Sequence, residues 1–192
     1  MHAALFDENG QLTRVVRNFA AGVNGFSGDK VHFADIDGDG YADYVLQAIN
    51  GSATVSINTH NVGSKSGERN FEAPRLIAGG VDDVPGSKIR YADLNGDGRA
   101  DYLILYDGGA VKAYINNGDY RFDEYGTVAT GVSGAPGSRV VLTDVDGDGY
   151  TDYVILAVER ELPSAGCMAD SDCSGECDVS IFSLLFILSI MA

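Results

Sequence analysis

The sequence contains no tryptophan, only three cysteines and four prolines, and few basic residues: 13 Lys and Arg stand against 28 Asp and Glu. Binding to nucleic-acid phosphates depends on clustered Lys and Arg, so this balance disfavours a nucleic-acid partner. The formal net charge of -15 favours cations as partners instead. The chain also lacks a sustained helical period before its C-terminal tail, which argues against a helical fold.

Three stretches of the chain repeat one another. Each contains the pattern D-x-[DN]-x-D-G-x-x-D, and the copies begin at Asp35, Asp93 and Asp144, with spacings of 58 and 51 residues. A unit of this length accommodates four short strands, the size of one β-propeller blade. Apolar or alternating runs between Gly-rich turns, such as residues 102–106 and 111–115, predict antiparallel strands.

These signals predict an all-β protein, namely a partial β-propeller of about three blades with four-stranded antiparallel blades. We expect blade units near residues 1–28, 29–86, 87–137 and 138–160, of which two are full and two are half blades. Closed propellers typically have about four to eight blades. We therefore expect a fragment or an arc that self-associates through its open blade edges.

The repeated nine-residue pattern predicts one calcium site in each unit, about three ions in all. Calcium takes roughly six to eight oxygen ligands, and carboxylates at positions 1, 3 and 5 turn inward when the backbone coils around the ion. Gly at position 6 permits the sharp turn, position 7 offers its backbone carbonyl, and Asp at position 9 closes the shell. The predicted ligand residues are Asp35, Asp37, Asp39, Tyr41, Asp43, Asp93, Asn95, Asp97, Arg99, Asp101, Asp144, Asp146, Asp148, Tyr150 and Asp152.

Two alternatives to such sites are weighed from the same residues. An EF-hand loop needs a carboxylate at position 12, but Leu46, Ile104 and Ile155 stand there, which excludes a helix-loop-helix site. Asp-Gly turns also close hairpins without any metal, but three copies in register favour the metal. Because Asn95 replaces a carboxylate, we expect weaker binding in the middle unit. Three divalent ions would reduce the charge from -15 to -9, so metal binding and stability should be linked.

Residues 33–44 and 91–102 carry the motif [YF]-A-D-[IL]-[DN]-G-D-G-x-A-D-Y. At these residues the chain resembles the FG-GAP/VCBS repeat family, the calcium-binding blades of the integrin α-subunit propeller and of many secreted microbial and fungal proteins. The resemblance implies a seven-bladed propeller in full-length relatives, with calcium in hairpin loops on one rim. It also implies roles in adhesion, in ligand binding or as a module of secreted hydrolases. The chain departs from this family in blade number, and only residues 134–137 retain the Gly-Ala-Pro signature.

The C-terminal part of the chain has a different composition. Residues 161–178 form a polar linker with Cys167, Cys173 and Cys177, a spacing that fits the start of a disulfide-rich module but leaves one thiol over. Residues 179–192 form an apolar tail that is too short to span a bilayer comfortably. The tail is either a lipid-anchor signal or a mispredicted or truncated chain end, and a membrane partner is expected only in the first case.

Together these features predict a non-catalytic calcium-binding β-propeller repeat module for extracellular recognition, adhesion or scaffolding. The chain lacks the G-x-S-x-G pattern, and its His residues show no ligand spacing. One alternative is an accessory module of a secreted hydrolase whose catalytic domain is absent from this chain, and another is a calcium-dependent carbohydrate binder. The expected partners are calcium and an extracellular protein or glycan. We expect an extracellular or cell-surface location, although the first residues show no signal peptide.

Overall fold

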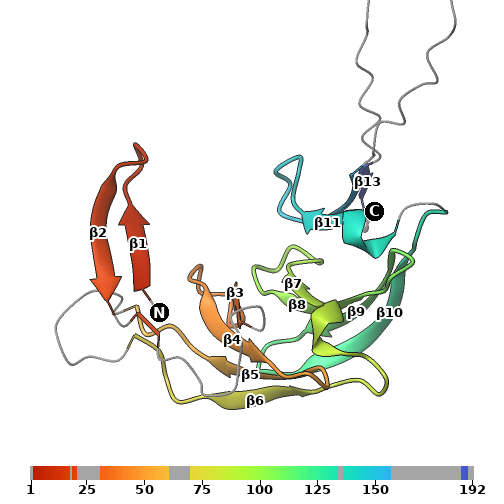
Figure 1. Ribbon diagram of the computed structural model, residues 1–192, viewed down its shortest axis with the longest axis horizontal. Helices are drawn as coiled ribbons and strands as arrows, with labels where there is room; N and C mark the ends of the chain where they lie inside the picture. Colours follow the sequence, from red (N-terminus) through yellow and green to blue (C-terminus); the bar gives the residue numbers. More distant parts are fainter. Residues whose placement is uncertain are drawn as a thin grey trace, which may run out of the picture.

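The protein is described here by a computed structural model that covers residues 2–17, 19–20, 31–60, 70–133, 136–156 and 187–189. This part of the chain consists of short β-strands and two single 3-10 turns (Figure 1). The elements are β1 (His2–Phe6), β2 (Leu12–Arg17), β3 (Val31–Ala34), β4 (Asp43–Gln47), β5 (Ser52–Ser56), β6 (Arg75–Gly79), η2 (Gly86–Lys88), β7 (Ile89–Ala92), β8 (Asp101–Leu105), β9 (Ala110–Asn116), β10 (Phe122–Thr130), η3 (Gly137–Arg139), β11 (Val140–Thr143), β12 (Asp152–Ile155) and β13 (Ile187–Ser189).

The strands form four separate antiparallel sheets. Sheet 1 contains β1 and β2, sheet 2 has the order β3-β4-β5-β6, sheet 3 has the order β7-β8-β9-β10, and sheet 4 has the order β11-β12-β13. In Figure 1 the sheets follow one another along an open arc that does not close into a ring. The predicted fold class is therefore confirmed: the protein is all-β, with two four-stranded antiparallel blades and incomplete sheets at both ends.

Some predictions about the organisation of the chain are not tested by this architecture. The proposed limits of the blade units stay predictions. The Cys-containing linker, residues 161–178, lies outside the described residues, as does most of the apolar tail. Within the part of the chain that the structure describes, no helix has the length and apolar character needed to cross a membrane.

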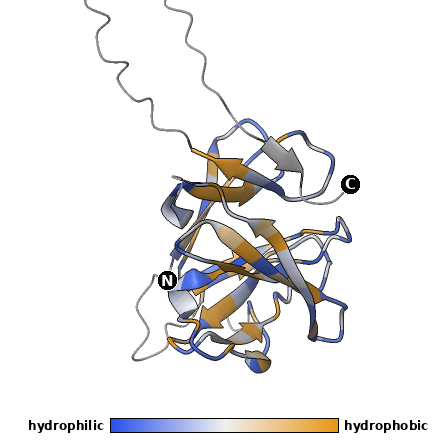
Figure 2. Cartoon of the chain, turned by 90° about the vertical axis from the view of Figure 1, so that its right-hand side faces the viewer, coloured by the Kyte–Doolittle hydropathy of each residue, from blue (hydrophilic) through white to orange (hydrophobic). Residues whose placement is uncertain are grey.

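The second strand of each repeat is the most deeply buried element. All residues of β4, β8 and β12 are buried, because each strand lies between two neighbours in its sheet and is covered on both faces. Their sequences, DYVLQ, DYLIL and DYVI, are rich in β-branched, aromatic and other apolar residues, which favour such positions. In Figure 2 hydrophobic residues are concentrated on the strands and hydrophilic residues on the connecting loops.

The hydrophobic core lies between neighbouring sheets. One buried cluster includes Leu103 and Val111 of sheet 3 together with Val140 and Tyr153 of sheet 4. A second cluster joins side chains of sheet 2 to Ala100, which immediately precedes β8. Truncating a fully buried leucine such as Leu103 typically costs about 2–5 kcal/mol. Apolar burial therefore holds the blades to one another as well as the strands within each blade.

A buried tyrosine at the same repeat position hydrogen-bonds to the preceding sheet. The Tyr102 hydroxyl donates to the Gly51 carbonyl at 2.8 Å, and the Tyr153 hydroxyl donates to the Gly109 carbonyl at 2.8 Å. Both acceptors lie in the hairpin turn that follows the second strand of a sheet. The same contact therefore recurs from one blade to the next.

The loops at the opposite end of these strands are joined by backbone hydrogen bonds. The Ala100 N–H donates to the Asp35 carbonyl at 2.7 Å, and the Thr151 N–H donates to the Asp93 carbonyl at 2.9 Å. In each case the first residue of one Asp-rich loop accepts from the eighth residue of the next loop. The loops of adjacent blades are thereby fixed at a constant offset.

Candidate metal centres

The three Asp-rich loops connect the first and second strands of their sheets. Loop 1 (residues 35–43) follows β3, loop 2 (residues 93–101) follows β7, and loop 3 (residues 144–152) follows β11. The last residue of each loop is the first residue of the following strand. The glycine at position 6 has a φ of 85° in loops 1 and 2 and 90° in loop 3, a backbone conformation that residues with a Cβ rarely adopt.

The aspartate at position 1 organises the backbone of its loop. In loop 1 one carboxylate oxygen of Asp35 accepts the N–H groups of Gly38 and Asp39 at 2.8 and 3.2 Å, and the other accepts the N–H of Gly40 at 2.7 Å. Asp93 makes the same three contacts in loop 2, and Asp144 makes two of them in loop 3. The carboxylate at position 1 therefore holds the backbone of its loop coiled around itself.

The aspartate at position 9 is buried and bridges two parts of its blade. Asp101 is fully buried, and its carboxylate accepts the N–H of Leu94 at 2.9 Å and the N–H of Asn116 at 2.8 Å. Asp43 makes the equivalent pair of contacts in loop 1. Burial raises the pKa of both Asp43 and Asp101 to about 6, although these hydrogen bonds to the carboxylates lower it.

Carboxylates converge in the first and third loops. One oxygen each from Asp35, Asp37 and Asp39 lies within 4.8 Å of the others, and Asp144, Asp146 and Asp152 form a similar group. Burial and the neighbouring Asp39 raise the pKa of Asp37, as expected for carboxylates that crowd one another. A hard cation would relieve this repulsion, since hard cations take oxygen ligands such as carboxylates. Loops 1 and 3 thus contain acidic groups that could bind a metal.

Loop 2 has a different arrangement. One carboxylate oxygen of Asp97 accepts from the Arg99 guanidinium at 2.8 Å and from the Asn95 amide at 3.1 Å. Among the described residues, groups of three or more converging His, Cys, Asp or Glu side chains occur in loops 1 and 3 and not in this loop, where Asn95 stands in place of a carboxylate.

The fifteen predicted ligand residues all lie in the three loops. Carboxylates converge in loops 1 and 3, whereas in loop 2 the Asp97 carboxylate pairs with Arg99. Whether each one binds an ion stays a prediction. The same holds for the position 7 carbonyls of Tyr41, Arg99 and Tyr150.

The sequence analysis did not predict two further residues, Asn58 and His60, that lie beside loop 1. The imidazole of His60 contacts the Asp39 carboxylate, and its ring stacks on Tyr41 with the ring centroids 4.3 Å apart. The His60 N–H also donates to the Asn58 side chain, as the Gly118 N–H does to Asn116 in the next repeat. Asn58 and Asn116 each lie 15 residues after the position 9 aspartate of their repeat, so a longer alignment of the repeats would have identified them. His60 has no counterpart at the same position of the next repeat, where Gly118 stands.

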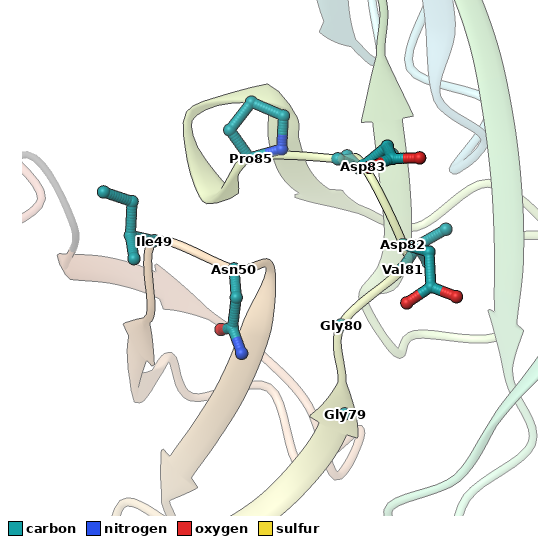
Figure 3. A pocket seen from close by; sticks show the side chains of 9 residues that line it. Ile49, Asn50, Gly79, Gly80, Val81, Asp82, Asp83 and Pro85 are labelled. Atoms are coloured by element: carbon teal, nitrogen blue, oxygen red, sulfur yellow. The ribbon is translucent and has the colours of Figure 1, made fainter.

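Two surface cavities lie outside the loop centres. A cavity of about 460 Å³ next to loop 1 is lined by Leu5, Phe19, Phe33, Tyr41, Ala42, Asn58 and His60. A second cavity, of about 410 Å³, separates the turn after β4 from the segment between β6 and η2 (Figure 3). In Figure 3 Asp82 and Asp83 lie across this second cavity from Ile49 and Asn50. The first cavity is the more apolar and aromatic of the two.

Comparison with known proteins supports the repeat assignment. Residues 93–155 match the model of the FG-GAP-like repeat, a range that covers loops 2 and 3 and strands β8 to β12. The predicted resemblance to FG-GAP-like repeats is thus confirmed for this part of the chain. No curated protein matches the chain.

Solved structures of two kinds resemble the fold. A crystal structure of TcdB2-TccC3-Cdc42 is 20% identical with a TM-score of 0.52, and the match covers 69% of this chain and 6% of that chain. A Tc holotoxin pore from Photorhabdus luminescens is 22% identical with a TM-score of 0.52, covering 78% of this chain and 7% of that one. A lectin from Agrocybe aegerita that recognises non-reducing terminal N-acetylglucosamine is 28% identical with a TM-score of 0.53, covering 77% of this chain and 38% of the lectin. This chain therefore spans only a minor part of each of these proteins.

Proposed function

We propose that the chain is a non-catalytic calcium-binding β-propeller repeat module that acts in recognition, adhesion or scaffolding outside the cell or at its surface. The observation that carries this proposal is the convergence of three carboxylates within 4.8 Å in both loop 1 and loop 3. The match of residues 93–155 to an FG-GAP-like repeat supports it. An accessory role beside a hydrolase domain stays an untested alternative.

Calcium is the cation that best suits these loops. The side chains offer carboxylate oxygens in a loop that contains neither Cys nor His, which disfavours zinc within the loop itself. Magnesium requires a strict octahedron and retains several waters, whereas calcium accepts a variable shell of roughly six to eight oxygens. When bound, the ion would neutralise charge at the loop centre, while Asp35 and Asp144 keep the surrounding backbone coiled through their N–H contacts.

The proposal is tested by titrating calcium into chelator-treated protein by calorimetry and by following thermal unfolding. A calcium concentration 100 times the dissociation constant would stabilise the folded state by about 2.7 kcal/mol for each site. We expect measurable binding heat and a rise in Tm that depends on calcium concentration. If millimolar calcium produced no binding heat and no shift in Tm, the metal assignment would be ruled out.

A matched pair of variants locates the binding. Asp37→Asn removes one carboxylate from loop 1, whereas Asp82→Asn removes a carboxylate that lies outside the three loops. In the calcium titration the first variant should lose or weaken binding at loop 1 while loop 3 still binds, and the second variant should bind like the wild type. Identical titrations of the two variants would show that no ion binds at loop 1.

A second candidate function is glycan recognition. Two observations favour it: the similarity to the N-acetylglucosamine-recognising lectin, and the aromatic cavity of about 460 Å³ beside loop 1. Ligand pockets are commonly lined by aromatic side chains with a few polar groups, and Tyr41 and His60 provide both kinds here. Retention on N-acetylglucosamine beads that is lost in Tyr41→Ala would support this function, whereas passage through the column unretained would exclude that sugar.

A further inference from the structure

The middle loop differs from its neighbours at two positions. Loops 1 and 3 have Asp at position 3 and Tyr at position 7, whereas loop 2 has Asn95 and Arg99. These changes lower the formal charge of the loop from -4 to -2, since one carboxylate is lost and one guanidinium is gained. Loop 2 therefore needs a bound cation less than its neighbours do.

The Arg99 guanidinium lies where it neutralises the loop directly. Its Nη2 donates to Asp97 Oδ2 at 2.8 Å, and the Asn95 amide donates to the same oxygen at 3.1 Å. The position 5 carboxylate thus already has two donors, one of them charged. A calcium ion would have to displace both contacts and would bind beside a fixed positive charge.

Arg99 is held in this place by neighbouring elements. Its Nε donates to the Asn116 carbonyl at 3.4 Å at the end of β9. Its Cγ also lies 2.9 Å from the position that a Cβ on Gly38 would take, so the arginine stem passes closely over loop 1. The guanidinium is therefore positioned by contacts with sheet 3 and with the adjacent blade.

The basic group beside loop 1 does not have the same effect. His60 contacts the position 5 carboxylate Asp39 there, but its side chain comes from outside the loop, and the carboxylates of Asp35, Asp37 and Asp39 still converge within 4.8 Å. In loop 2 the Arg99 side chain belongs to the loop itself and pairs with the position 5 carboxylate Asp97. Loop 1 therefore keeps the converging carboxylates that loop 2 lacks.

We propose that Arg99 takes the place of a bound cation in loop 2, so that the chain binds two calcium ions, in loops 1 and 3, and none in loop 2. This inference rests on the proposed calcium function and specifies its stoichiometry. It also means that loop 2, between the two complete blades, keeps its structure without calcium, whereas the structures of loops 1 and 3 depend on the ion.

Exchange of the distinguishing residues tests the stoichiometry. The Asn95→Asp/Arg99→Tyr variant gives loop 2 the residues of the other loops at both positions, and Asp146→Asn/Tyr150→Arg makes the reverse change in loop 3. By calorimetry we expect two ions in the wild type, three in the first variant and one in the second. Three ions of similar affinity in the wild type, or two ions in a folded first variant, would overturn the proposal.

A measurement without calcium separates this proposal from the calcium function itself. In chelator, Arg99→Gln should lower Tm by about 2–4 °C, a shift typical of a modest loss in a chain of this size. Asp97→Asn added to Arg99→Gln should lower Tm by less than Asp97→Asn does alone, because the pair between the two side chains is already lost. Additive effects of the two substitutions would refute the role of Arg99 whatever calcium does. Coupled effects without calcium binding at any loop would support that role and refute the calcium function.

Discussion

The carboxylate of Asp101 provides the sharpest test of how these blades are held together. It is fully buried and accepts one N–H from the start of its own loop, at Leu94, and another from the end of β9, at Asn116. Asp101→Ala would leave both N–H groups buried without an acceptor. We therefore expect a large loss of stability even though no metal is present.

The magnitude follows from the two lost acceptor contacts. An unsatisfied buried N–H costs roughly 1–3 kcal/mol. Part of this cost is offset, because burial of the carboxylate is itself unfavourable and raises the pKa of Asp101 to about 6. The expected net loss is about 2–4 kcal/mol, which corresponds to a fall in Tm of about 10 °C for a chain of this size.

The assay is thermal unfolding in chelator at pH 7, with two further variants. Asp101→Asn keeps one acceptor oxygen and should lose about half as much stability as the alanine variant. Asp107→Ala is the matched control, because that side chain is 94% exposed and pairs with Lys88, and surface ion pairs contribute about 0–1 kcal/mol. If Asp101→Ala unfolded within about 1 kcal/mol of Asp107→Ala, the bridging role assigned to position 9 would be refuted.

Three further outcomes are expected. Tyr102→Phe should cost about 1 kcal/mol, measured by denaturant unfolding, because it removes one buried hydrogen bond to the preceding blade. Gly86→Ala should prevent soluble folding, because its Cβ would lie 2.1 Å from a backbone oxygen of that blade, whereas Gly108→Ala meets nothing within 4 Å and should express normally. In chelator, Tm should fall as pH rises from 5 to 7. The pKa of Asp43 and Asp101 is raised to about 6, so between about pH 4 and 6 the folded state binds more protons than the unfolded state. The folded state therefore loses stability as these two carboxyl groups ionise. An unchanged or rising Tm across that range would contradict the assigned burial effect.

The general fold was predictable from the sequence because its signals are local and repeated. The pattern of aspartates and glycines marks each hairpin loop, and the apolar run after position 9 marks a buried strand, as found for β8. Three copies in register reinforced one another. The prediction of four-stranded antiparallel blades therefore needed no information about long-range contacts.

The details of the loops were not predictable in the same way. The pattern treats Asp43 as a ligand like Asp35, but the folded chain surrounds its carboxylate with backbone N–H groups from Ile36 and Asn58. The second of these donors is 15 residues away, and its approach depends on the pairing of β4 with β5. Likewise, His60 contacts Asp39 of loop 1 only because the chain returns beside that loop after β5.

The contacts between adjacent loops have a consequence for how such a chain can grow by gene duplication. The Asp35 and Asp93 carbonyls receive their hydrogen bonds from backbone N–H groups, which every residue except proline provides. This joint therefore places no requirement on the side chains of a newly copied unit, although the apolar contacts between blades do. The seven-residue difference between the two spacings, 58 and 51, lies outside this joint and leaves it unchanged. Copies of the unit can thus differ in length and in side chains and still make the same backbone contact between adjacent loops.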